Sequence, residues 1–315
     1  MKKIAVFILV GFISGILGAF VGLKFALPQT TQIIQRLVPA ERALDKYSID
    51  SLSNTVVKPS KIEIGEILQD KPEFTSYVFS MNFDPTLLGT QNKKLTGVIN
   101  IPKVGGPFPV ILMFRGYVDQ KLYVPGEGTM HAGEVFVKNG FITVAPDFLG
   151  YGESDSEAGD IFESRFQTYT TAMAVLESVK SLPQFDGDNL FLWGHSNGGH
   201  IALALLTITG KAYPTVLWAP VSKPFPYSVL YYTDDSDDGG KLIRRELAKF
   251  ESLYDTDLYS VNRYYNKIQA QIELYQGNAD DAVPNVWSDI LTSQLKKAKV
   301  DIKYYTYPGA NHNLT

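Results

Sequence analysis

The stretch that decides the fold is Asn189-Leu-Phe-Leu-Trp-Gly-His-Ser-Asn-Gly-Gly-His200, followed by Ile201-Ala-Leu-Ala-Leu-Leu206. The apolar run Leu190 to Trp193 predicts a short buried strand, and the second run predicts a buried helix. Between them lies Gly194-His-Ser-Asn-Gly198, a G-x-S-x-G pattern. A serine in a tight turn between a strand and a helix is typical of a nucleophile elbow. We therefore expect Ser196 to be a nucleophile.

Glycines surround this serine for a steric reason. An elbow has a strained backbone and needs small neighbours, which Gly194 and Gly198 supply. The alternative is a glycine-rich turn with an idle serine. In an elbow the backbone N–H of the next residue, here Asn197, contributes to an oxyanion hole.

A second oxyanion donor is expected after an earlier strand. The apolar run Phe108 to Phe114 predicts that strand, and Arg115-Gly116-Tyr117 follows it. Gly116 permits close approach of the backbone, and the Tyr117 N–H is the predicted donor. Arg115 is expected either to form a structural salt bridge or to bind an anionic group.

The general base is sought among four histidines. Only His312 lies well downstream of Ser196, on a loop after Asp301 to Thr306, which alternates like a strand. A histidine there is placed to accept the proton of the serine hydroxyl. The alternative is a surface-loop histidine. His195 and His200 flank the serine and are expected to be poor bases for it.

The acid is expected on the loop after another strand, Gln271 to Gln276. Gly277 ends this strand, and Asp280 and Asp281 follow. A carboxylate there would orient His312 and stabilise its imidazolium form. Both aspartates are candidates, and the unused one would cap a loop or a helix start.

Four motifs together resemble the catalytic domain of the prolyl oligopeptidase family of serine peptidases. They are Pro146-Asp-Phe-Leu-Gly-Tyr-Gly-Glu-Ser154, Gly194-His-Ser-Asn-Gly-Gly199, Gly277-Asn-Ala-Asp-Asp-Ala-Val-Pro284 and Ala310-Asn-His312. The sequence is also similar to dienelactone hydrolases and acetyl esterases of the same α/β-hydrolase fold. The resemblance covers roughly residues 90 to 315.

This resemblance implies specific roles. Ser196 would be the nucleophile, Asp280 the acid and His312 the base. The chain departs from its relatives in the oxyanion loop, which reads Phe-Arg-Gly-Tyr, and it has no stretch long enough for the β-propeller of the family's peptidases.

The domain organisation follows from periodicity. Strand patterns at 61–68, 75–83 and 95–101 predict an antiparallel start, and strands alternating with helices predict a mostly parallel central sheet with helices on both faces. The catalytic domain is expected at residues 61–315. A tyrosine-rich insertion at 222–268 is the predicted lid, and its acidic run Asp234 to Asp238 is expected to be a solvated loop, with a calcium site as the alternative.

The N-terminus predicts a membrane anchor. Ile4 to Leu23 is an uncharged run, long enough at about 1.5 Å per residue to span a bilayer core. We expect residues 1–27 to form an uncleaved anchor with a transmembrane helix at about 4–23, and residues 28–60 to form a stalk. A cleaved signal is the alternative. A slight lysine bias favours a single-pass protein with the catalytic domain outside the cytoplasm.

Composition narrows the function. The chain has 315 residues, a net charge of −4 and no cysteine, which excludes disulfides and thiolate chemistry and argues against a nucleic-acid surface. No cofactor or metal is expected. The first hypothesis is a serine hydrolase of peptidase type that acts on short peptides through an acyl-enzyme. The alternatives are a carboxylesterase or deacetylase with the same triad, and a non-catalytic binding protein.

Overall fold

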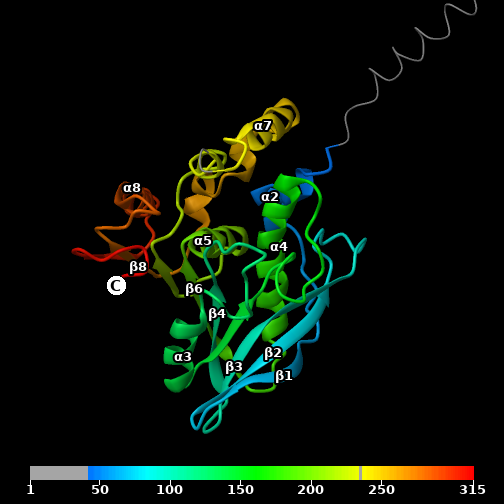
Figure 1. The fold of residues 1–315 in the computed structure, drawn as a ribbon, viewed down its shortest axis with the longest axis vertical. Helices are drawn as coiled ribbons and strands as arrows, with labels where there is room; N and C mark the ends of the chain where they lie inside the picture. The colour runs from blue at the N-terminus through cyan, green and yellow to red at the C-terminus, as the bar shows by residue number, and fades with distance from the viewer. Residues whose placement is uncertain (1–41, 234–235) are drawn as a thin grey trace, which may run out of the picture. The chain divides into compact units, whose positions relative to one another are not determined.

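The computed structural model describes residues 42–233 and 236–315, and a compact unit begins at Leu44 and ends at Thr315 (Figure 1). One nine-stranded sheet lies at the centre of this unit. Its strands are β1 (Glu63–Asp70), β2 (Phe74–Phe83), β3 (Lys93–Pro102), β4 (Phe108–Phe114), β5 (Ile142–Pro146), β6 (Phe185–His195), β7 (Thr215–Trp218), β8 (Ile272–Gly277) and β9 (Ile302–Tyr307).

The sheet is mixed, as the sequence predicts. The strand order is β1-β2-β3-β5-β4-β6-β7-β8-β9. The pairs β1–β2, β2–β3 and β3–β5 are antiparallel, and every later pair is parallel. In the pairing of β4 with β6, Phe114 lies opposite Gly194. The loop after β4 therefore emerges beside Ser196.

The helices follow the strands in alternation. They are α2 (Ile49–Ser53), α3 (Met130–Lys138), α4 (Ile161–Val179), α5 (Asn197–Thr209), α6 (Tyr227–Leu230), α7 (Lys241–Leu253) and α8 (Asn285–Lys297), with 3-10 turns η1 (Asp45–Tyr47), η2 (Thr256–Tyr259) and η3 (Val261–Lys267). The Asp160 carboxylate caps the start of α4, where it accepts hydrogen bonds from the Phe162 and Glu163 N–H groups.

The two faces of the sheet are covered unequally. Alternate residues of a strand point to opposite faces, so Leu112 joins the large core that contains α4, α5 and α8, while Met113 packs toward α3. Helices on both faces were expected and are present. The core under α5 is nearly continuous, because its residues from Gly198 to Ile208 are all buried.

The domain begins earlier than predicted. Residues 44–60, expected to belong to a stalk, pack onto the domain: Tyr47, Ile49 and Leu52 are buried, and the Tyr47 hydroxyl donates to Glu163 of α4 at 2.9 Å. The boundary in the structure is Leu44 instead of residue 61. The short apolar spacing of this segment escaped the sequence reasoning because it matches only one helical turn.

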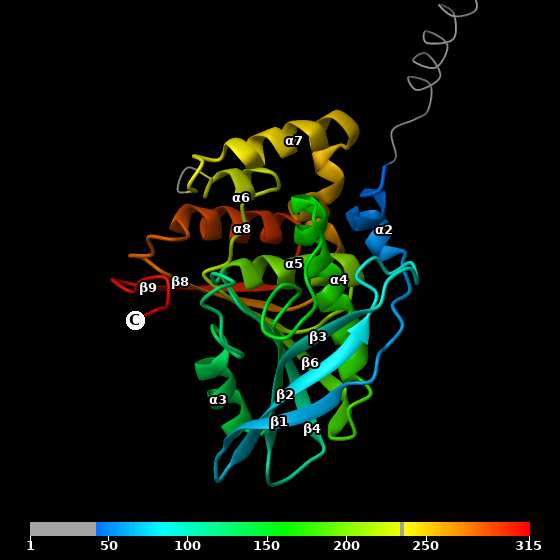
Figure 2. The same cartoon turned by 45° about the vertical axis from the view of Figure 1, so that its right-hand side comes forward.

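The insertion between β7 and β8 contains α6, α7, η2 and η3. Figure 2 shows α6 and α7 above α5 and α8 in that view. Phe225, Phe250 and Tyr259 pack against Phe162 and Phe166 of α4.

The tyrosines of this insertion divide into two groups. Tyr254, Tyr259 and Tyr265 are buried packing residues, whereas Tyr227, Tyr231 and Tyr232 are exposed. The insertion is therefore anchored on α4 by its buried aromatic residues, and it presents other aromatic residues to solvent.

The predicted transmembrane span, residues 4–23, lies outside the described residues. In the part of the chain that the structure describes, no helix is long and apolar enough to cross a membrane.

Candidate active site

The strand–serine–helix turn forms as predicted. β6 ends at His195, α5 begins at Asn197, and Ser196 between them has φ 55° and ψ −120°. A positive φ is strained for a serine. The main chain is fixed on both sides, because Ser196 N–H donates to Trp218 O at 2.9 Å and Ser196 O accepts from Val221 N–H at 2.9 Å.

The elbow glycines are required by close backbone contacts. A Cβ on Gly194 would lie 2.5 Å from the Gly198 carbonyl oxygen, and one on Gly198 would overlap the carbonyl of Phe114. Neither neighbour can retreat, because both are backbone atoms in core elements. These positions therefore admit only glycine without a shift of the sheet or of α5.

The structure joins two of the predicted residues directly. His312, after β9, and Asp280, after β8, share hydrogen bonds of 2.9 Å from Nδ1 to Oδ2 and 3.1 Å to Oδ1. The Asp280 side chain is fully shielded, while 18% of the His312 side chain is exposed. Asp281 is exposed, so of the two aspartates only Asp280 contacts the histidine.

Donors surround the Asp280 carboxylate. Oδ1 accepts from the N–H groups of Ala282 at 3.0 Å and Val283 at 2.8 Å, and Oδ2 accepts from Gln276 Nε2 at 2.7 Å. Gln276 is in turn fixed by the Ser288 hydroxyl at 2.7 Å. These donors fix the orientation of the Asp280 carboxylate independently of its bond to His312.

Ser196 and His312 approach each other without a direct bond. Among the described residues, the Ser196 hydroxyl makes no hydrogen bond with His312. Their elements meet through His195, whose ring lies 4.6 Å from that of His312, centroid to centroid. Hydrogen bonds of this kind are often long before substrate binds.

The loop after β4 lies against the serine. A Cβ built on Gly116 would be 3.0 Å from Ser196 Cβ and 3.5 Å from Oγ. The next residue, Tyr117, has a side chain that is largely exposed, which leaves its main chain to line the site. Asn197 is the first residue of α5, where N–H groups are free of intrahelical partners.

Arg115 fixes that loop. It is buried, and it donates from Nη1 to Gly116 O at 2.9 Å and from Nη2 to Asp147 O at 3.0 Å, while its guanidinium lies 4.0 Å from the centre of the Tyr151 ring. It therefore binds carbonyls and a ring, and within residues 42–233 and 236–315 it forms no salt bridge of the kind considered from the sequence. Since C=O and N–H point in opposite directions across a trans peptide, the bond to Gly116 O turns Tyr117 N–H away from Arg115.

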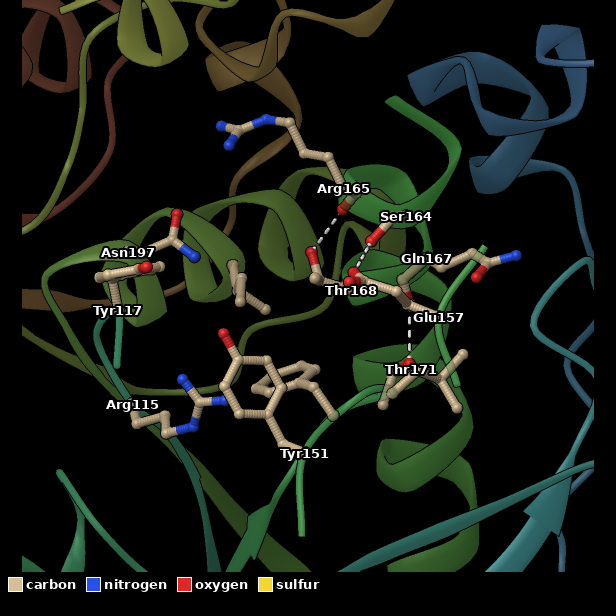
Figure 3. Close-up of a pocket in the computed structure, with 13 residues that line it drawn as sticks. Arg115, Tyr117, Tyr151, Glu157, Ser164, Arg165, Gln167, Thr168, Thr171 and Asn197 are labelled. Atoms are coloured by element: carbon tan, nitrogen blue, oxygen red, sulfur yellow. Dashed lines mark hydrogen bonds between the residues drawn. The ribbon is translucent and has the colours of Figure 1, made fainter. Parts of the chain in front are cut away.

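A cavity of about 130 Å³ extends from the loop to α4 (Figure 3). Tyr117 and Asn197 line it together with residues of α4 and of the loop after β5. The other lining residues are Arg115 of the loop after β4, Ile201 of α5, and Phe148, Leu149, Tyr151, Glu157, Ser164, Arg165, Gln167, Thr168 and Thr171. The cavity therefore joins both predicted oxyanion donors.

The two histidines near Ser196 in the chain, His195 and His200, are neutral. Burial, with the charge of His312, lowers the pKa of His195 to about 4, and burial lowers that of His200 to about 3. The Val221 carbonyl can only accept, so His200 Nδ1 donates to it at 3.2 Å and Nε2 accepts from the Tyr169 hydroxyl at 2.7 Å. Both rings are structural groups at neutral pH.

Three polar side chains of the site escaped the sequence reasoning. They are Arg115 as a ligand of carbonyls, Gln276 as a ligand of Asp280, and His195 as a neighbour of His312. Gln276 carried a signal, because it occupies an inward position of a core strand where an apolar residue is expected. The contacts of Arg115 with Asp147 and of His195 with His312 join distant parts of the chain and leave no local pattern.

Comparison with known proteins identifies the family of the chain. The profile of the prolyl oligopeptidase family matches residues 129–315, more than half of the chain. An acetyl esterase of Xylanibacter ruminicola is 22% identical over 81% of this chain, which spans 59% of that protein. An uncharacterised peptidase of Bacillus subtilis is 23% identical over 70% of this chain and 81% of its own length.

A solved structure matches the fold as well. An acetyl xylan esterase from Paenibacillus sp. R4 superposes with a TM-score of 0.63 at 19% identity, covering 84% of this chain and 86% of that one. The chain belongs to the prolyl oligopeptidase family and is a serine-type hydrolase with the α/β-hydrolase fold.

Proposed function

We propose that the protein is a carboxylester hydrolase that acts on short acyl esters. Ser196 Oγ attacks the ester carbonyl and gives its proton to His312 Nε2, while Asp280 stabilises the imidazolium. The oxyanion accepts hydrogen bonds from the N–H groups of Tyr117 and Asn197. The alcohol leaves with the proton from His312. Water then attacks the acyl-enzyme carbonyl and gives its proton to His312, and the acid is released from Ser196, which takes the proton back.

The size of the cavity carries this proposal. At about 130 Å³ it is smaller than the roughly 300–1,000 Å³ of pockets that hold drug-sized ligands. It lies directly beside the predicted oxyanion donors, so it fits a short acyl chain. The acetyl esterases among the similar proteins support the same substrate class.

A matched substrate pair tests the proposal. We expect p-nitrophenyl acetate to be hydrolysed with a kcat/KM well above that for short peptide p-nitroanilides, and Ser196→Ala to abolish both activities together with fluorophosphonate labelling. Full turnover by Ser196→Ala would refute the mechanism.

Peptidase activity on short peptides is the second candidate. The family match, which covers the Gly277 to Pro284 motif and the histidine loop, favours it. Anilide turnover equal to or faster than ester turnover in the experiment above would replace the esterase proposal with this one.

The insertion at 222–268 is proposed as a lid. Tyr232 Oη donates to Ala282 O at 3.1 Å beside Asp280, and the Tyr231 ring lies 4.7 Å from that of Trp287. We expect Tyr231→Ala to change the preference between acetyl and longer acyl esters several-fold, and Tyr227→Ala, which is also exposed, to leave it unchanged. Identical preferences for both variants and the wild type would reject the lid.

The sequence further supports a single-pass anchor at 4–23 with the catalytic domain outside the cytoplasm. In that arrangement the full chain sediments with membranes, and added protease digests its domain in spheroplasts. Mature soluble protein with an N-terminus near residue 28 would contradict the anchor and support a cleaved signal.

A further inference from the structure

His195 connects the nucleophile turn to the loop of the predicted base. It is the last residue of β6 and directly precedes Ser196. Its ring packs against that of His312 in a tilted arrangement, with centroids 4.6 Å apart and planes at 36°, and its Nε2 lies 3.1 Å from the His312 main-chain oxygen. One side chain of the elbow thus contacts both the ring and the main chain of His312.

The direction of this hydrogen bond is fixed by chemistry. A carbonyl oxygen can only accept, so His195 Nε2 carries the proton and donates it. The ring is held in that orientation by Trp218, edge-on at 5.8 Å, and by Trp193 at 6.3 Å. Both tryptophans belong to core strands, so the donor has a rigid support.

Two further hydrogen bonds of the histidine loop come from different directions. Ala279 N–H donates to Ala310 O at 2.9 Å from the β8 side, and the Asn311 side chain accepts from Asn313 N–H at 2.9 Å within the loop itself. Neither contact connects the loop to the turn that carries Ser196. His195 provides this connection, because it directly precedes Ser196 in the chain.

We propose that His195 is a positioning residue, which holds the His312 loop against the elbow so that the base and the nucleophile keep a fixed separation. The inference rests on the roles proposed above for Ser196 and His312. The residue acts through His312 and does not touch the substrate.

The charge of His195 agrees with this role. Burial keeps its pKa near 4, and the charged groups that act on it are His312 and Asp280. Its ring is therefore neutral when His312 becomes an imidazolium during the reaction. A neutral ring beside this cation does not repel it, whereas a second cation there would oppose the proton transfer.

Two substitutions separate positioning from packing. His195→Gln keeps an N–H donor at about the same distance from the main chain, but loses the ring. His195→Phe keeps the ring and its contacts with Trp218, but loses the donor. If the hydrogen bond positions His312, we expect kcat on p-nitrophenyl acetate to fall on the order of tenfold in the Phe variant and less than threefold in the Gln variant, with KM nearly unchanged.

The outcomes are distinct. A Phe variant as active as the wild type, or a Gln variant less active than the Phe variant, would overturn the proposal. If the Phe variant does not fold, His195→Met, which also lacks a donor, takes its place. The same two substitutions at His131, exposed on α3, are the control and should change nothing. If Ser196→Ala still hydrolyses the ester, the proposed function itself is wrong, whatever the His195 variants do.

Discussion

Replacing Asp280 with asparagine tests the central pair of the site most directly. In the structure four donors meet this carboxylate: two main-chain N–H groups at Oδ1, and Gln276 Nε2 and His312 Nδ1 at Oδ2. An asparagine offers only one acceptor oxygen. Two of the four donors must therefore lose their acceptor.

The geometry decides which donors lose. The two N–H groups of Ala282 and Val283 are main-chain donors and cannot rotate, so the amide oxygen is expected to take the Oδ1 position. The amide NH₂ then faces His312 Nδ1 and stabilises the tautomer protonated at Nε2, which cannot accept the serine proton. Loss of an orienting acid of this kind costs about 10⁴ in kcat, or about 5 kcal/mol in the activation free energy.

The assay is kcat and kcat/KM on p-nitrophenyl acetate, with the melting temperature as a check on folding. Asp281→Asn is the matched control, because that side chain is exposed and does not contact His312; we expect it to stay within twofold of the wild type. A folded Asp280→Asn enzyme within tenfold of the wild type, or equal damage from both variants, would refute the reasoning.

Three further predictions concern the elbow and its surroundings. Arg115→Lys keeps the charge but loses the two-pronged grip on two carbonyls, so kcat on p-nitrophenyl acetate should fall by about 10- to 100-fold with KM little changed; unaltered kcat would show that Arg115 does not orient the Tyr117 peptide. The free energy of unfolding of Ser196→Gly in urea should exceed that of Ser196→Ala by about 1 kcal/mol, because glycine adopts the positive φ without strain. Equal urea midpoints would mean that the turn stores no strain. The folded pKa of His200, about 3, is below its ordinary value, so the unfolded state binds more protons and the free energy of unfolding falls as pH drops from 6.5, by about 2 kcal/mol at pH 5. His200→Asn should remove that part of the pH dependence in urea titrations, and an unchanged slope would contradict it.

Local sequence patterns predicted the parts of the fold that depend on residues close together in the chain. Leu190 to Trp193 and Ile201 to Leu206 predicted a strand and a helix, and β6 and α5 contain them. The same holds for the strand patterns at 75–83 and 95–101, which lie within β2 and β3. Periodicity works here because each of these elements buries one continuous set of apolar side chains, and the periods of strand and helix differ.

Contacts between distant segments were beyond such patterns. Residues 44–60 were expected to be a stalk, but the burial of Tyr47 depends on α4, more than a hundred residues further along the chain. The choice between Asp280 and Asp281 was likewise open from the strand pattern and was made only by the resemblance. In the structure Asp280 meets His312, because the turn after β8 buries one carboxylate among fixed donors and leaves the other in solvent.

By itself, then, the sequence determined the type and order of the elements and the chain order of Ser196, Asp280 and His312, because these are properties of neighbouring residues. The tertiary structure decided which side chains meet. It placed Arg115 on the Asp147 carbonyl, Asp280 on the His312 ring and His195 on the His312 main chain. Each of these contacts joins groups that are held by different strands or loops, and its geometry arises only when the parallel sheet brings the carboxyl ends of its strands to one edge.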